Sequence, residues 1–217
     1  MIRPIFLFLI IISSLYFINQ KDFSSSIDKV DIEGAFNFAD EQLITEQAKL
    51  LIGKNLYSIN LRHHKNEFEK IPWVKYSQLS INPPNQITVK IIEHNPLFLW
   101  NEIHYVNRDM QNFITPNLPI KNILSLSSNN YNYNEMYELF QSIQSYLLDI
   151  NEVILTLWKQ DDMLEIKSES LTIIVRYSRY RDKIRKFVSI YPELESKLKK
   201  RKKNHFDLRY PTGFAVR

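Results

Sequence analysis

The sequence contains no cysteine. A disulfide, a thiolate metal site and a cysteine nucleophile are therefore excluded. The absence fits a compartment in which free thiols are a liability.

Glycine is also scarce, with three residues in 217. A phosphate cradle needs glycines to bring backbone N–H groups close to the ligand, and neither a glycine-rich phosphate loop, a G-x-S-x-G elbow nor an H-E-x-x-H pair occurs. His63 and His64 are adjacent, so on a helix their side chains diverge by about 100° and do not chelate one metal together. Asp161-Asp162 is typical of a hairpin turn rather than of an acid pair. We therefore predict no catalytic, cofactor-binding or metal-binding residues.

Charge of one sign is not strongly in excess. The net charge is +4, which is too small to indicate a nucleic-acid partner. The basic residues do gather in one run, Lys197–Lys203, where six of seven are Lys or Arg. This run is either the solvated end of a helix or a contact for anionic lipid or an acidic partner segment, and the sequence leaves both open.

One apolar run stands at the amino end. Ile5 to Ile18 is apolar apart from two serines, and Arg3 is the only charge before it. At ~1.5 Å per residue, a helix from residue 1 to residue 18 spans about 27 Å, against roughly 30 Å of hydrocarbon. We predict a retained anchor over residues 1–20, with Arg3 cytoplasmic and the bulk of the chain across the membrane. A cleaved signal peptide is the alternative.

A first domain is expected over residues 29–94, after a polar linker at 21–28. Alternating and helical apolar patterns predict strand, helix, helix, strand, strand in that order. The expected strands are Val30–Ile32, Trp73–Ile81 and Ile87–Ile91, and the expected helices run from Asp40 or Asn37 to about Leu51 and from Asn60 to Ile71.

A second, strand-rich domain is expected over residues 95–217. Its apolar pattern predicts a mixed β domain with an antiparallel sheet and flanking helices, so the whole chain is α+β. The expected elements are a hairpin around Asn101-Glu102, a loop with at most one short strand over 107–130, a helix over Asn134–Leu148, a three-strand meander over Val153–Val175, and a helix from Ile184 that is stopped by Pro192.

The end of the chain predicts an edge strand. Phe206, Leu208 and Tyr210 alternate with polar residues, Pro211-Thr212-Gly213 interrupts the pattern, and Phe214 resumes it. A central strand does not tolerate that proline, so we expect an edge. Such an edge is either covered or accepts a strand from a partner.

The order of these features resembles the bacterial FtsQ (DivIB) family with its POTRA domain. The residues that carry the likeness are Val30–Gly34, Gly53–Leu56, Pro72–Val74, Ile87–Val89 with Glu93, Pro96, Trp100, Phe206–Tyr210 and Gly213–Val216.

The resemblance implies a non-catalytic, single-pass inner-membrane protein of the division septum that links early and late division proteins. An FtsB-like strand, from a complex with an FtsL-like protein, would join the final strand. FtsK-like and FtsW-like proteins would contact the POTRA domain, and neither nucleic acid nor a small-molecule substrate is expected. By the same resemblance the partner strand would be held by Arg209, Tyr210, Thr212, Gly213 and Phe214, with Lys186 beside them.

Two other classes of function remain open from the sequence. One is a periplasmic or secreted POTRA module that acts in protein secretion or outer-membrane assembly. The other is a degenerate envelope enzyme, for example a hydrolase.

Overall fold

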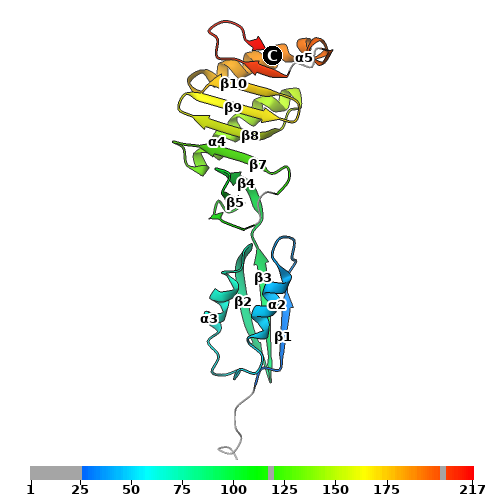
Figure 1. Cartoon of the computed structure of the whole chain (residues 1–217), viewed down its shortest axis with the longest axis vertical. Coiled ribbons are helices and arrows are strands. Elements are labelled where there is room, and N and C mark those ends of the chain that lie inside the picture. Colours follow the sequence, from blue (N-terminus) through cyan, green and yellow to red (C-terminus); the bar gives the residue numbers. More distant parts are fainter. Residues whose placement is uncertain (1–25, 117–119, 201–203) are drawn as a thin grey trace, which may run out of the picture. The chain divides into compact units, whose positions relative to one another are not determined.

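The computed structural model describes residues 26–116, 120–200 and 204–217. For residues 196–200 it describes the backbone only. The predicted anchor over 1–20 and the side chains of the Lys197–Lys203 run lie outside the described residues. Among the helices of the described ranges, none is long and apolar enough to cross a membrane. The chain divides into two compact units, which meet in sequence between His94 and Asn95 (Figure 1).

Unit 1 is a three-stranded sheet with two helices. The strand order is β1-β3-β2, with β1 parallel and β2 antiparallel to the central β3. The elements are β1 (Lys29–Glu33), α2 (Glu41–Lys49), α3 (Leu61–Phe68), β2 (Val74–Asn82) and β3 (Gln86–Glu93). The predicted strand, helix, helix, strand, strand order is confirmed.

Short polar caps and an alternating core produce unit 1. Asp40 accepts a hydrogen bond from the Gln42 N–H (2.8 Å), and Asn60 accepts one from the His63 N–H (3.0 Å), so each helix begins where a side chain satisfies a free backbone donor. The helices then bury residues against the inward-facing positions of the strands. This core contains Ile44, Ala48, Leu51, Phe68, Ile87, Val89 and Ile91.

Unit 2 is built on a nine-stranded mixed sheet of order β12-β11-β10-β9-β8-β7-β4-β5-β6. The strands β8, β9 and β10 form the predicted antiparallel meander. The strands are β4 (Pro96–Trp100), β5 (His104–Asn107), β6 (Asn112–Phe113), β7 (Leu124–Ser128), β8 (Ile154–Gln160), β9 (Met163–Ser168), β10 (Thr172–Arg176), β11 (His205–Asp207) and β12 (Ala215–Val216).

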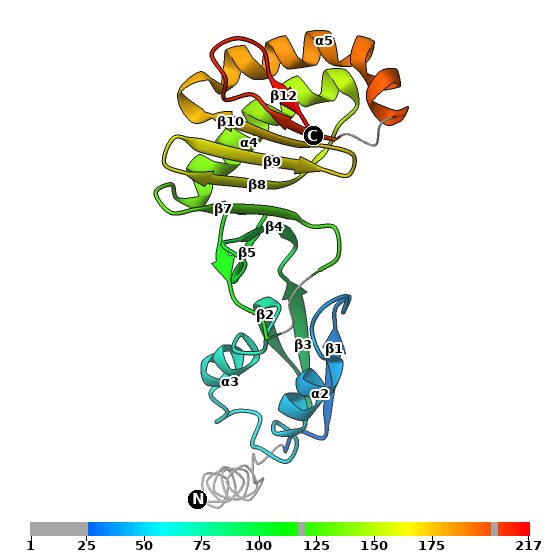
Figure 2. The same ribbon diagram turned by 45° about the horizontal axis from the view of Figure 1, so that its top comes forward.

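Two long helices pack side by side against this sheet (Figure 2). The helix α4 (Tyr133–Leu147) begins at Asn132, which forms a reciprocal capping box with Glu135. The short 3-10 turn Leu148–Ile150 directly follows α4. A second one, Tyr177–Arg179, leads directly into the helix α5 (Tyr180–Lys200). Residues of both helices and of the strands form one continuous apolar core.

Two expectations for unit 2 are wrong. The helix α5 continues through Pro192 instead of stopping there; Tyr191, the residue before the proline, is buried against Phe187 and Phe206, so packing holds the helix where local preference would end it. The region 107–130 contains two strands rather than at most one, and β7 lies inside the sheet between β4 and β8. Its alternation of Leu and Ser was hidden in a stretch rich in polar residues.

Candidate functional site

The carboxyl end of the chain closes one side of the larger sheet as a folded-back pair of strands. The strand β11 pairs in parallel with β10 and antiparallel with β12, and β12 is the last strand in the sheet order. The edge expected over the end of the chain is therefore formed by its last part only. The strand β11 ends at Asp207, the chain's own β12 covers it, and β12 takes the outer position.

The aromatic residues of this end divide into a buried and an exposed set. Phe206 is buried, and Phe214 is half-buried with its ring 5.8 Å from the Phe187 ring and 6.3 Å from the Phe206 ring, measured between centroids. Tyr210 lies beyond the end of β11 and remains 48% exposed. Phe214 thus mainly closes the core of its own unit, whereas Tyr210 presents its ring to the surroundings.

The loop that joins β11 to β12 is exposed and held by a lysine. The Lys183 ammonium on α5 donates to the carbonyl of Tyr210 and, at 3.1 Å, to that of Pro211. Gly213 has a φ of +72°, and nothing lies within 4 Å of the position of an added Cβ. Glycine is therefore required here by the backbone conformation and not by a close approach within the chain.

Arg209 is bound to a buried carboxylate. Its Nε donates to Asp207 Oδ1 at 2.8 Å and its Nη2 to Asp207 Oδ2 at 2.6 Å, and its backbone N–H also donates to Oδ1 at 3.1 Å. The Asp207 side chain is 7% exposed and that of Arg209 is 44% exposed. These bonds, outweighing the opposing effect of burial, lower the pKa of Asp207, and they raise the pKa of Arg209. The pair fixes the start of the loop.

Lys186 is exposed on α5. Residues three apart lie on the same side of a helix, so Lys186 shares the face of α5 from which Lys183 holds the loop. The placement of Lys186 beside the loop that contains Arg209 and Tyr210 stays a prediction. Sequence reasoning missed Lys183, although a second basic residue one helical turn before Lys186 was a usable signal.

A buried lysine braces the neighbouring β8–β9 turn. Lys159 is 2% exposed, and its ammonium donates to the Asp161 carbonyl (2.9 Å) and to Asn130 Oδ1 (3.0 Å). It also lies over the rings of Tyr131 and Tyr177, 4.1 and 4.8 Å from their centroids. The hydrogen bond between the Tyr131 and Tyr177 hydroxyls, together with burial, raises the pKa of Tyr131 to about 12.

That turn and the carboxyl-end loop border a common hollow. It measures about 400 Å³ and is lined by Gln160, Asp161, Asp162, Met163, Arg176 and Arg209. The Asp162 carboxylate accepts bonds from the backbone N–H and hydroxyl of Ser178, which lower its pKa. Asp161-Asp162 forms the predicted hairpin turn, and the Asp162 carboxylate anchors the backbone at Ser178.

The adjacent histidines differ in burial. His64 is buried and His63 is exposed, and their rings lie edge to face with centroids 5.2 Å apart. Within residues 26–116, 120–200 and 204–217, no group of three or more His, Cys, Asp or Glu side chains is placed to hold a metal ion.

Comparison with known proteins shows what the chain resembles. Residues 25–94 match the model of the FtsQ-type POTRA domain. The cell division protein FtsQ of Haemophilus influenzae is 25% identical over 85% of this chain and 73% of its own length, and that of Bordetella pertussis is 24% identical over 76% and 67%. The Escherichia coli FtsQ is 22% identical over 68% of this chain and 56% of its own length.

The chain resembles the FtsQ family over most of its length. These relatives are cell division proteins, and the similarity, together with the FtsQ-type POTRA match, supports a non-catalytic role over the hydrolase interpretation. Unit 1 corresponds to the POTRA match, and unit 2 carries the edge formed by β12.

Proposed function

We propose that this chain is a membrane-anchored assembly protein of the division machinery that links early and late division proteins. A β-strand of an FtsB-like partner, in complex with an FtsL-like protein, is added to β12. The observation that supports this most is the strand order, which leaves β12 at the end of the larger sheet and places an exposed loop directly before it.

The short length of β12 limits what main-chain pairing can contribute. The strand has two residues, Ala215–Val216, so few ladder hydrogen bonds are available, and side chains must supply much of the affinity and specificity. Tyr210 offers an exposed ring with a polar tip, and Thr212 offers a hydroxyl beside it. Lys186 adds a positive charge on the adjacent helix face.

Arg209 has two roles in this proposal. Its guanidinium carries five N–H donors, and the Asp207 carboxylate engages the side chain through Nε and Nη2. The pair holds the loop in shape, and the exposed remainder of the guanidinium faces the partner. Phe214 supports the edge from below by packing on the core.

The family and the sequence support the remaining parts of the proposal. The apolar run at residues 1–20 anchors the chain in the bacterial inner membrane, with the amino end in the cytoplasm and both units in the periplasm. The POTRA domain contacts FtsK-like and FtsW-like proteins. The secretion or outer-membrane assembly role remains as an alternative only if the leader is cleaved.

The test is capture of the partner by the full chain in detergent. Tyr210→Ala and Gly213→Val should each lose capture of an FtsB-like segment in complex with an FtsL-like one, while Tyr210→Phe keeps most of it. Gly53→Val is the matched control for backbone strain, because Gly53 also has a positive φ (+80°) and open space around it but lies in unit 1.

Wild-type capture by both Tyr210→Ala and Gly213→Val would contradict the docking site. If Gly53→Val loses capture of the partner to the same extent, the effect is due to general destabilisation. Anchoring and placement are tested separately by a fluorescent protein at the amino end, which should form a ring at mid-cell; a uniform envelope signal would contradict the division role.

A further inference from the structure

One end of unit 1 exposes three large apolar side chains close together in sequence. Leu50, Ile52 and Tyr57 are between 50% and 58% exposed. All three lie in the segment that joins α2 to α3. Five other large apolar side chains in the described part of unit 1 are 37–45% exposed, so these three are the most exposed of the set. Single exposed apolar residues are ordinary on a protein surface, but several in one short segment indicate a contact surface.

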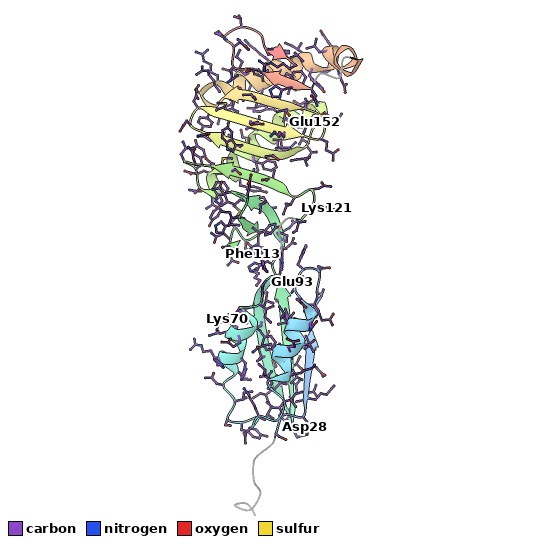
Figure 3. All side chains as sticks on the ribbon, in the orientation of Figure 1. Asp28, Lys70, Glu93, Phe113, Lys121 and Glu152 are labelled. Carbon is purple, nitrogen blue, oxygen red and sulfur yellow. The ribbon has the colours of Figure 1, made fainter. Side chains whose placement is uncertain are left out.

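This segment lies where the described chain begins. The Ile27 N–H donates to the Lys54 carbonyl at 2.9 Å, and the Gly53 N–H donates to the Ile27 carbonyl at 2.8 Å. Figures 1 and 3 show the same arrangement: the connection from α2 to α3 runs along the end of unit 1 that is marked by Asp28, and Glu93 marks the opposite end.

The predicted anchor limits how far this end can be from a membrane. Five residues, 21–25, separate residue 20 from Ser26. At most ~3.6 Å per residue is available to an extended chain, so Ser26 lies within roughly 20 Å of the end of the anchor. The apolar group is thus on the part of unit 1 that the covalent chain holds next to the bilayer.

The charges around the group suit an anionic surface. Lys49 and Arg62 are both exposed and flank the segment, at the end of α2 and in the first turn of α3. Basic residues near a membrane that contains anionic phospholipid are attracted to it, and the attraction falls off within a Debye length. Tyrosine is enriched at the level of the headgroups, where its ring and its hydroxyl both find a suitable environment.

We propose that this end of unit 1 docks on the bilayer surface. Leu50, Ile52 and Tyr57 enter the interface, and Lys49 and Arg62 contact anionic headgroups. The inference rests on the proposed membrane anchor, and it adds that the POTRA domain has a fixed face against the lipid.

The absence of cysteine allows a direct test in the full chain. A single cysteine at Ile52 or Tyr57 is labelled with an environment-sensitive fluorophore, and the protein is reconstituted into phosphatidylglycerol-containing vesicles with or without spin-labelled lipid. The control is Leu43→Cys, since Leu43 is 43% exposed on α2 but lies six residues before Lys49, where that helix ends, or about 9 Å along the axis. These vesicles contain no other protein, so quenching reports lipid alone.

The expected result is severalfold stronger quenching at positions 52 and 57 than at 43, with a decrease in high salt or in vesicles of phosphatidylcholine only. Flotation of the vesicles is read from the same sample. Protein that floats with equally weak quenching at all three positions overturns the docking and leaves the anchor standing. Protein that does not float overturns the anchor and the docking with it.

Discussion

Replacing Arg209 by Ala should destabilise unit 2 even in the absence of any partner. The substitution removes two charge-assisted hydrogen bonds, of 2.8 and 2.6 Å, from an Asp207 side chain that is only 7% exposed. Breaking a buried pair costs about 3–5 kcal/mol and breaking a surface pair about 0–1 kcal/mol. Since the carboxylate is buried and the guanidinium is 44% exposed, we expect an intermediate loss of about 2 kcal/mol.

The assay is thermal and urea unfolding of the full chain, followed by a signal assigned to unit 2. A loss of about 2 kcal/mol corresponds to a fall in Tm of roughly 8 °C for a domain of this size. The loss should depend on pH with a definite sign. The folded pKa of Asp207 is lowered, so its contribution to stability is present above the unfolded pKa of about 4 and is lost as the pH falls through the folded pKa. The difference in the free energy of unfolding between wild type and Arg209→Ala should therefore become smaller at acidic pH.

A second substitution separates structure from binding. Asp207→Asn combined with Arg209→Ala removes the unpaired charge and should recover part of the lost stability. If the double variant is stable and still fails to capture the partner, Arg209 contacts the partner directly. An Arg209→Ala protein within about 0.5 kcal/mol of wild type at neutral pH would refute the structural role given to the pair.

Three further predictions concern His64, Lys159 and Gly34. Burial and the nearby Lys54 lower the pKa of His64 from its ordinary value of 6.5. Unit 1 should therefore lose stability as the pH falls below about 6.5. In urea titrations at pH 7.5 and pH 5.5, His64→Gln should reduce this pH dependence of the free energy of unfolding. Lys159→Met should cost about 2 kcal/mol in urea unfolding, because two oxygens lose their buried donor. Gly34→Ala should cost about 1–2 kcal/mol by the same measurement, because its Cβ would lie 2.9 Å from the Ile91 carbonyl oxygen.

Local signals explain why much of the fold could be predicted. Asp40 and Asn60 each satisfy a backbone donor within three residues, so the sequence near them contains the whole reason for the helix start. The alternation in β3 and in the meander likewise reflects one buried face. The Asp161-Asp162 turn could be predicted because it lies between two such alternating patterns.

Long-range pairing explains what could not be predicted. The alternation that begins at Phe206 indicates a strand but not which strands flank it, and β12 covers β11 only because the chain turns back at Gly213. The ion pair between Arg209 and Asp207 was missed for a related reason. On a flat strand, the Arg209 side chain would share a face with Asp207 without binding its carboxylate. Pro192 was misjudged because the packing of α5 outweighs a local preference.

The central claim is that β12 receives a foreign strand, and amide hydrogen exchange of the full chain tests it most directly. Exchange would be measured with and without the periplasmic segments of an FtsB-like and an FtsL-like partner. We expect new protection over residues 212–217 and unchanged exchange at β6, the strand at the other end of the same sheet. Tight complex formation with no added protection over residues 212–217 would contradict it.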